Sequence, residues 1–330
     1  MTYLLITLLT NLLLLLFFNN IKKFISLYDT PDKKLKMHKH KVPLLGGIFI
    51  IFNYLVFLAV YLITETSFIT FSTSREYLSI FLFVSLFFLV GLYDDKYNSK
   101  PFSKILILTF ISIVVVLINN NLIIKNITLS FYDNNIFLFN FSIFFTVFSI
   151  IILVNSLNFY DGINGQSILF FIAIFSFLYL SFDHNLFYLL NVIILSMLLI
   201  LNIKNKLFLG DSGIYLLSAV LSFSLLYEYN VNKNFIRADD IFILLMLPGF
   251  DLVRLSLTRI LNGKNAFVGD RNHIHHLLNN KFSLLTTNFI LIIMFALPIF
   301  FKNLLMLNNI INIFIFLLIY CILIILIQRK

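Results

Sequence analysis

The chain has 330 residues, of which 60% are hydrophobic and only 12% are charged, and its mean hydropathy is +0.99. This composition excludes an ordinary soluble domain and indicates a polytopic membrane protein. The net charge of +9 comes from lysines and arginines in short loops between apolar runs, where they mark topology, so nucleic acid is not an expected partner. Cys321, the single cysteine, excludes a disulfide framework and a thiolate metal site.

Eleven apolar runs approach the length of a membrane-spanning helix, which predicts an all-α polytopic membrane protein with one integral membrane domain over residues 1–330. The first run, residues 3–18, lacks a cleavage site and is followed by Lys22 and Lys23, so we expect it to be retained with its N-terminus outside. The other runs cover residues 44–63, 78–92, 104–118, 141–155, 166–182, 186–201, 212–227, 241–260, 284–300 and 306–327.

Lysines and arginines are concentrated in alternate loops between these runs. The positive-inside rule then predicts which loops face the cytoplasm: residues 20–43, 93–103, 156–165, 202–211 and 259–283. The loop over residues 122–140 is expected to face outside.

Two segments depart from plain apolar runs. Residues 126–139 alternate apolar and polar residues beside Asp133-Asn134-Asn135, which predicts a short outer β-hairpin that turns there. Pro248-Gly249 lies within the ninth run and directly precedes Asp251 and Arg254, so we expect that helix to be broken or kinked.

A dense basic segment runs from Asp29 to the glycine pair Gly46-Gly47 and includes His38. It either enforces topology and attracts anionic lipid, or holds a phosphorylated lipid head group at the membrane surface.

Adjacent carboxylates, Asp94 and Asp95, end the third run. Pro101 starts the next run and places Lys104 in its first turn. Two neighbouring carboxylates raise the affinity for a proton or a cation. The alternative is an exposed, solvated loop.

A polar cluster follows the fifth run. Asn155, Asn158 and Asp161 recur every three residues and are joined by Asn164, while glycines at 162 and 165 allow a tight turn. These groups are too costly to leave unpaired in hydrocarbon, so they predict a site at the membrane surface or in a watered cavity. The simpler interpretation is a helix-ending turn capped by amides.

Asp211 lies between Gly210 and Gly213 at the start of the eighth run. A helix N-terminus favours an anion there, and a Mg²⁺ held by the carboxylate could bridge to phosphate. A plain N-cap is the alternative.

Three imidazoles and an arginine lie close together after the ninth run, at His273, His275, His276 and Arg271. A zinc site is disfavoured, because there is no cysteine partner and the spacing does not place all three histidines on one helical face. Contact with an anion or a pyrophosphate fits better.

In this order the motifs resemble those of the polyprenyl-phosphate N-acetylhexosamine-1-phosphate transferases. The matching positions are Asp29, Pro31, His38, Pro43 and Gly46-Gly47; Asp94-Asp95 with Lys104; Asn155, Asn158, Asp161-Gly162 and Asn164-Gly165; Asn202 and Phe208 to Gly213; and Asp270-Arg271 with His273 to His276. Two departures, Lys204-Asn205 for a proline-alanine pair and Ile214 for a serine, concern nucleotide or sugar preference.

The resemblance implies a phosphoglycosyl transferase of the bacterial cytoplasmic membrane, with its active site on the cytoplasmic face. The implied reaction moves an N-acetylhexosamine 1-phosphate, in the closest branch N-acetylglucosamine 1-phosphate, from a UDP-sugar to undecaprenyl phosphate and releases UMP. This is the first membrane step of a cell-envelope polysaccharide. Mg²⁺ is the implied cofactor, Mn²⁺ is an alternative ion, and a homodimer is allowed.

The resemblance also implies residue roles. Asp211 and Asn158 would hold Mg²⁺, and Asp94 would position or deprotonate the lipid phosphate with Asp95 close by. Lys104 would offset the carboxylate pair. The substrate contacts would come from Asn155, Asp161 and Asn164, from Phe208 stacked on uracil, and from His38, Arg271, His273, His275 and His276.

Three rival functions are compatible with parts of this pattern. The first is phospho-N-acetylmuramoyl-pentapeptide transferase of peptidoglycan synthesis, which differs in its UDP-sugar. The second, a transporter of a lipid-linked intermediate, is disfavoured because ionisable residues are nearly absent from the runs apart from Asp251 and Arg254. The third is a binding-only homologue, although no acidic motif residue is lost.

Overall fold

The computed structural model describes residues 2–31, 40–65, 73–182, 185–231, 236–263 and 271–328. Among these residues, nine helices are long and apolar enough to span a membrane, or ten if the bent pair at the N-terminus counts as one span. A further apolar helix, α7 (Gln166–Ser181), is shorter. The prediction of an all-α polytopic membrane protein is confirmed, while the number of spans and their orientation stay predictions.

The chain divides into two compact units, each built from two separate segments. The first unit comprises Met1–Asn119 and Ser167–Val220, and the second comprises Asn120–Gln166 and Leu221–Lys330. The expectation of a single membrane domain stays a prediction.

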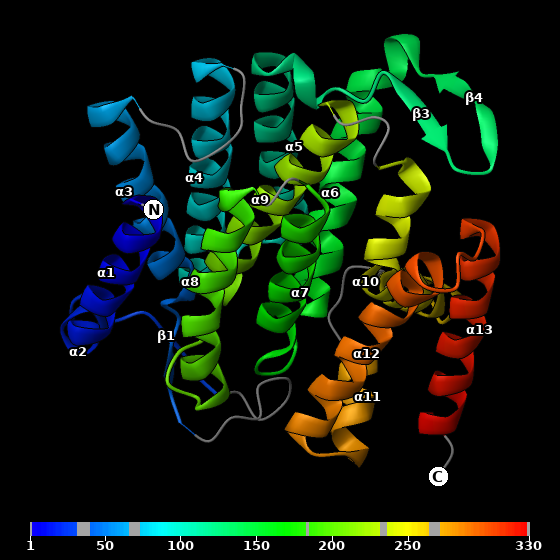
Figure 1. Ribbon diagram of the computed structural model, residues 1–330. Coiled ribbons are helices and arrows are strands. Elements are labelled where there is room, and N and C mark those ends of the chain that lie inside the picture. Colours follow the sequence, from blue (N-terminus) through cyan, green and yellow to red (C-terminus); the bar gives the residue numbers. More distant parts are fainter. Residues whose placement is uncertain are drawn as a thin grey trace. The chain divides into compact units, whose positions relative to one another are not determined.

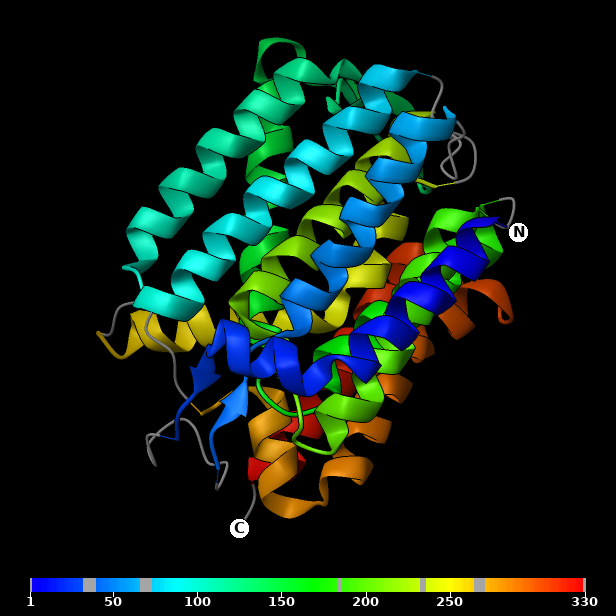
Figure 2. The same cartoon turned by 90° about the vertical axis from the view of Figure 1, so that its left-hand side faces the viewer.

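The first unit is a helical assembly around α3 (Gly46–Thr64) and α4 (Ser74–Tyr97). Its helix α1 (Thr2–Leu16) packs against α3 and α8 (Leu186–Ile203), and α4 packs against α5 (Pro101–Ile118) (Figures 1 and 2). Most of α7 and the first half of α9 (Gly210–Val231) complete it.

Short elements and caps fix the ends of these helices. Thr73 and Glu76 form a capping box at the start of α4, and Pro101 occupies the first turn of α5. Helix α2 (Phe18–Ile25) is bent by 67° from α1. The two-residue strands β1 (Tyr28–Asp29) and β2 (Val42–Pro43) pair antiparallel.

The second unit is organised around α10 (Ala238–Leu261), which packs against α6 (Ser142–Tyr160), α12 (Leu284–Asn303) and α13 (Asn309–Gln328). The short helix α11 (Ile274–Lys281) contacts α12 and α13. Strands β3 (Asn126–Leu129) and β4 (Tyr132–Phe137) lie between two single 3-10 turns, Asn120–Leu122 and Phe139–Phe141 (Figure 1).

The antiparallel pairing of β3 with β4 confirms the predicted hairpin, but the predicted turn position is wrong. The strands turn at Ser130-Phe131, and Asp133 to Asn135 lie within β4. The backbone N–H of Ser130 donates to Asp239 Oδ1 at 2.9 Å, and its hydroxyl donates to Oδ2. This anchor on α10 fixes the turn at a position that the Asp-Asn-Asn signal did not indicate.

The ninth run was predicted to be broken or kinked, and of these two alternatives the structure shows the kink: α10 continues as one helix through Pro248. Its second half nevertheless runs in a different direction from its first half (Figures 1 and 2). A proline removes one backbone donor and bends a helix without ending it when the rest of the hydrogen-bond ladder persists. Asp251 and Arg254 bond to each other and to other side chains of this unit, so the helix does not have to break to accommodate their charges.

Candidate active site

The residues singled out in the sequence fall into two groups, one in each unit. The first unit holds Asp94, Asp95, Lys104, Phe208 and Asp211. The second unit holds Asn155, Asn158, Asp161, Asn164, Arg271, His273, His275 and His276. His38 and Asp270 lie outside the described residues.

In the first unit, the end of α4 lies directly against the first turn of α9. A Cβ added at Gly91 would lie 2.5 Å from both the Asp211 carbonyl oxygen and the Ser212 Cα. Real Cβ atoms do not approach backbone this closely, so only glycine permits this contact. The contact brings the adjacent residues Asp94 and Asp95 to the start of α9.

Asp95 caps α9 from another helix. Its Oδ1 accepts from the backbone N–H of Asp211 at 2.8 Å, and its Oδ2 accepts from that of Ser212 at 3.0 Å. These N–H groups have no partner within their own helix, and the positive end of the helix dipole favours a carboxylate. Both oxygens of Asp95 are therefore used to order the start of α9.

Asp94 is only 2% exposed and has three polar contacts at the beginning of α5. Its Oδ1 accepts from the backbone N–H of Ser99 at 2.8 Å and from the Ser99 hydroxyl at 2.9 Å. Its Oδ2 forms an ion pair with Lys104. Burial makes an unpaired carboxylate costly, so these contacts hold Asp94 charged and in one orientation.

The side chain of Asp211 completes a cluster of three carboxylates. Its carboxyl group lies within hydrogen-bond reach of that of Asp94, and Asp95 adjoins it through the backbone bonds described above. Such proximity of like charges favours the uptake of a proton or a cation. The cluster is thus a candidate cation site next to a helix N-terminus, which also attracts anions.

The loop before α9, which carries Phe208, is fixed by the segment from β2 to the start of α3. The Phe208 N–H donates to Pro43 O at 2.9 Å, and Gly46 N–H donates to Phe208 O at 3.0 Å. Asn202 Nδ2 donates to Leu207 O at 3.0 Å. This pairing explains the glycine pair: a Cβ at Gly47 would lie 2.5 Å from Gly213 N. The sequence showed that the glycine pair was unusual but did not show that it packs against the start of α9.

In the second unit, the polar cluster lies at the end of α6. Asn155 Nδ2 donates to Ile151 O of its own helix at 2.8 Å, whereas Asp161 is exposed and Asn158 is half-buried. The Asn164 carbonyl accepts from Asn288 Nδ2 on α12 at 2.8 Å. The Asn155 side chain therefore bonds back to the interior of its own helix and does not cap the end of α6, and Asp161 is exposed.

The histidine segment is organised by Asp251, whose role was missed in the sequence. His273 Nδ1 lies 2.9 Å from Asp251 Oδ2, and Tyr320 OH donates to Asp251 Oδ1 at 2.8 Å. Arg254 donates to Asp251 Oδ1 at 2.7 Å and to Tyr320 OH at 2.9 Å. The sequence did contain a signal for this network, because Asp251 and Arg254 lie within an apolar run and charges there need polar partners.

His275 is the most enclosed of the three imidazoles, at 1% exposure. Burial, and secondarily the neighbouring His276 and His273, hold the pKa of His275 well below its usual range, so the ring is neutral at pH 7. Its Nδ1 lies 3.1 Å from Gln166 Nε2, and its Nε2 faces Gly162 without a hydrogen-bond partner. An unpaired buried nitrogen suits a ligand at the Asp161–Gly165 loop.

A metal ion in this second group is conceivable from distances alone. Single ligand atoms of Asp251, His273 and His275 lie within 4.8 Å of one another. Arg254 contacts the same carboxylate, and Arg259 lies 3.4 Å from His273 Nε2. The surrounding positive charge therefore favours an anion here.

Comparison with known proteins gives one family match and several relatives. The model of glycosyl transferase family 4 matches residues 77–228, which include Asp94, Asp95, Lys104 and Asp211. The undecaprenyl-phosphate alpha-N-acetylglucosaminyl 1-phosphate transferases of Escherichia coli O157:H7 and Yersinia pestis are 26% and 28% identical to the chain. These matches cover 81% and 77% of this chain and 72% and 70% of the relatives.

A relative of the same description from Haemophilus influenzae is 25% identical over 83% of this chain and 77% of its own length. These relatives, the family match and the five ordered motifs agree with one another. The chain is similar to glycosyl transferase family 4 over residues 77–228.

Proposed function

We propose that this phosphoglycosyl transferase transfers N-acetylglucosamine 1-phosphate, or a related N-acetylhexosamine 1-phosphate, from a UDP-sugar to undecaprenyl phosphate. The observation that carries the proposal is the cluster of Asp94, Asp95 and Asp211 at the N-terminus of α9. The relatives named above supply the acceptor and the sugar.

In the proposed reaction, an oxygen of the lipid phosphate attacks the sugar-bearing phosphorus of the UDP-sugar. The bond between that phosphorus and the bridging oxygen breaks, and UMP leaves with the electron pair. Several negative charges meet at this step, so the protein contributes mainly by positioning the phosphates and neutralising their charge. A phosphate monoester is largely ionised at neutral pH, so a strong base is hardly needed.

The contacts of Asp94 support a positioning role. Ser99 and Lys104 occupy its oxygens and hold the group in one orientation. Lys104 offsets part of the charge of the carboxylate cluster, which reduces the repulsion that an incoming phosphate would meet.

The carboxylate cluster fits Mg²⁺, with Mn²⁺ as an alternative. Mg²⁺ is usually bound by one or two carboxylates together with substrate phosphates and water. Asp211 is the suitable ligand, because both oxygens of Asp95 already accept backbone N–H groups. Bound there, the ion would neutralise charge on the diphosphate. A contribution of Asn158 to the same ion stays a prediction.

The second unit offers groups suited to the nucleotide and the sugar phosphates. Asp161 and Asn164 lie on the loop after α6, and the histidine segment combines neutral His275 with the positive charges of Arg254 and Arg259. We infer that these residues contact the donor, that the active site faces the cytoplasm of a bacterial inner membrane, and that the product begins an envelope polysaccharide.

A donor panel tests the proposal. Purified protein in detergent receives undecaprenyl phosphate, Mg²⁺ and one UDP-sugar at a time, including UDP-N-acetylglucosamine, UDP-N-acetylgalactosamine and UDP-N-acetylmuramoyl-pentapeptide. UMP release is measured, and the lipid product is identified by mass. Turnover with an N-acetylhexosamine donor supports the proposal, and turnover with the pentapeptide donor alone assigns the peptidoglycan reaction. If no donor yields UMP and the protein instead moves a lipid-linked sugar across the membrane of vesicles, the transferase proposal would be wrong and the protein would be a transporter.

A further inference from the structure

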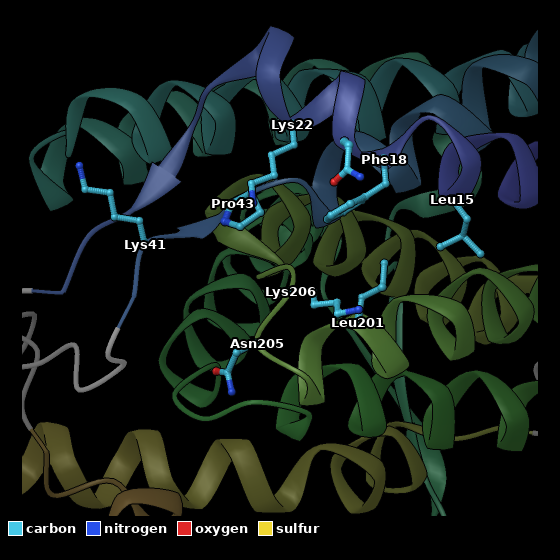
Figure 3. A pocket seen from close by; sticks show the side chains of 9 residues that line it. Leu15, Phe18, Lys22, Lys41, Pro43, Leu201, Asn205 and Lys206 are labelled. Carbon is cyan, nitrogen blue, oxygen red and sulfur yellow. The ribbon is translucent and has the colours of Figure 1, made fainter.

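The first unit contains a cavity that lies outside the carboxylate cluster. Its volume is about 450 Å³, and Figure 3 shows the side chains around it. The lining residues are Leu15, Phe18, Asn19, Lys22, Lys41, Pro43, Leu201, Asn205 and Lys206. They come from α1 and α2, from β2 and the residue before it, and from the end of α8 and the loop that follows it.

The lining combines an apolar part with a strongly basic part. Leu15, Phe18 and Leu201 supply the apolar surface, while Lys22, Lys41 and Lys206 supply three positive charges. Among the described residues that line the cavity, none is acidic. In Figure 3, Lys22 and Lys206 lie on opposite sides of the lining, and Lys41 stands apart on the left with its amino group pointing outward. An anion with an apolar portion matches this chemistry.

Local backbone geometry produces this arrangement. The 67° bend between α1 and α2 turns the chain away from the axis of α1. Helix α2 then presents Lys22 and Lys23 in its last turn beside Phe24, which is 90% exposed. An amphipathic helix with lysines and an exposed aromatic residue is typical of the membrane interface.

On the opposite wall, Asn205 has φ +54°, a left-handed conformation that asparagine tolerates better than most residues. The turn at Asn205 places Lys206 in the cavity lining, directly after the end of α8. Leu15 and Leu201 belong to the apolar helices α1 and α8, and Leu12 and Leu16 of α1 are 53% and 70% exposed. The cavity therefore adjoins a surface suited to hydrocarbon.

We propose that this cavity binds the head group of an anionic membrane phospholipid. Lys22 and Lys206 contact the phosphate, Lys41 adds attraction at the rim, and Leu15, Phe18 and Leu201 contact the adjoining glycerol and first acyl carbons. A free phosphate would use the lysines but leave the apolar wall uncovered, so the lining favours the lipid. Basic pockets beside membrane-spanning helices suit such head groups.

A pair of charge-matched double variants tests the proposal. Lys22→Gln with Lys206→Gln removes two lining lysines, whereas Lys23→Gln with Lys204→Gln removes two exposed lysines from the same helix and the same loop that do not line the cavity. Both variants change the net charge equally. Native mass spectrometry of the full chain in detergent measures one-to-one binding of phosphatidylglycerol and, as a zwitterionic reference, phosphatidylcholine.

We expect the lining variant to bind phosphatidylglycerol about 10-fold to 30-fold more weakly, as two lost lysine contacts imply, and the control to bind as the unaltered protein does. Binding of phosphatidylcholine should be equal in all three proteins, which also shows that the variants are folded. Equal losses in both variants, or no loss in either, would overturn the site. Displacement of phosphatidylglycerol by inorganic phosphate alone would assign the cavity to free phosphate and overturn the lipid assignment.

Discussion

Asp95 and Asp211 lie side by side at the first turn of α9, yet their carboxylates have different surroundings. Asp95 uses both oxygens to accept backbone N–H groups, whereas Asp211 faces the carboxylate of Asp94. The contacts of Asp95 hold the start of α9, whereas the closeness of Asp211 to Asp94 favours the uptake of a proton or a cation. The two types of contact lead to different expectations for their variants.

Asp211→Asn is expected to reduce kcat on the order of 100-fold with little change in thermal midpoint, because the amide keeps the shape but weakens a hard anionic ligand. UMP release at limiting and saturating Mg²⁺ measures the effect. Asp133→Asn, at an exposed position of β4, is the matched control and should behave as the unaltered protein does. Near-normal turnover of Asp211→Asn at limiting Mg²⁺ would remove this residue from the cation site.

Asp94→Asn should reduce kcat more than Asp95→Asn, because Asp94 is the carboxylate that faces Asp211. Asp95→Asn should instead lower the free energy of unfolding by about 1 kcal/mol, since an amide has one acceptor oxygen for two N–H groups. Turnover and thermal denaturation of each variant separate the two effects. The opposite order of kcat values would assign the reacting phosphates to Asp95.

At the scale of elements, glycine decides how closely α4 and α9 approach. Gly91→Ala places a Cβ against backbone, so we expect a loss of about 1–3 kcal/mol in stability and a parallel loss of activity as the Asp95 cap is stretched. Gly249→Ala in α10 is the control, because a Cβ there has nothing within 4 Å. It should be neutral or stabilising by up to about 1 kcal/mol. Thermal unfolding in detergent compares them, and equal stability of both variants would argue against close packing at Gly91.

Sequence patterns located the helices well, because hydrophobic length is a strong local signal. Each of the eleven apolar runs coincides with a helix, although the first continues into the bent helix α2. The hairpin turn was misplaced because Asp239, more than 100 residues away in the chain, anchors Ser130. The break at Pro248 was expected because the sequence showed the charges of Asp251 and Arg254 but not Tyr320, which satisfies both.

The sequence predicted which residues form the candidate site better than it predicted what each of them contacts. Motif order brought Asp94, Asp95 and Asp211 into one hypothesis, and the structure places all three around one helix N-terminus. That Asp95 would cap α9, or that Pro43 and Gly46 would hold Phe208, depends on long-range backbone pairing. Periodicity and composition carry no information on such pairing.

At the scale of the whole molecule, the charges of the loops predict which side of the membrane each loop faces. In a Cys321→Ser background, Asn134→Cys should react with a membrane-impermeant maleimide in intact cells, whereas Lys100→Cys should not, as the distribution of lysines and arginines predicts. Lys100 is exposed, unlike its neighbour Ser99, which bonds to Asp94. Both cysteines should react after permeabilisation. Labelling of Lys100→Cys alone in intact cells would invert the topology.

The cap on α9 has a consequence for the order in which the protein is made. Asp95 and its partner Asp211 are 116 positions apart, so α4 leaves the ribosome long before the first turn of α9 is synthesised. Until then the carboxylates at the end of α4 have no helix N-terminus beside them, and the glycine at position 91 has no backbone to pack against. The cluster of three carboxylates therefore forms only when the first turn of α9 comes to lie beside the end of α4. A nascent chain stalled before residue 210 carries two of the three carboxylates and no site.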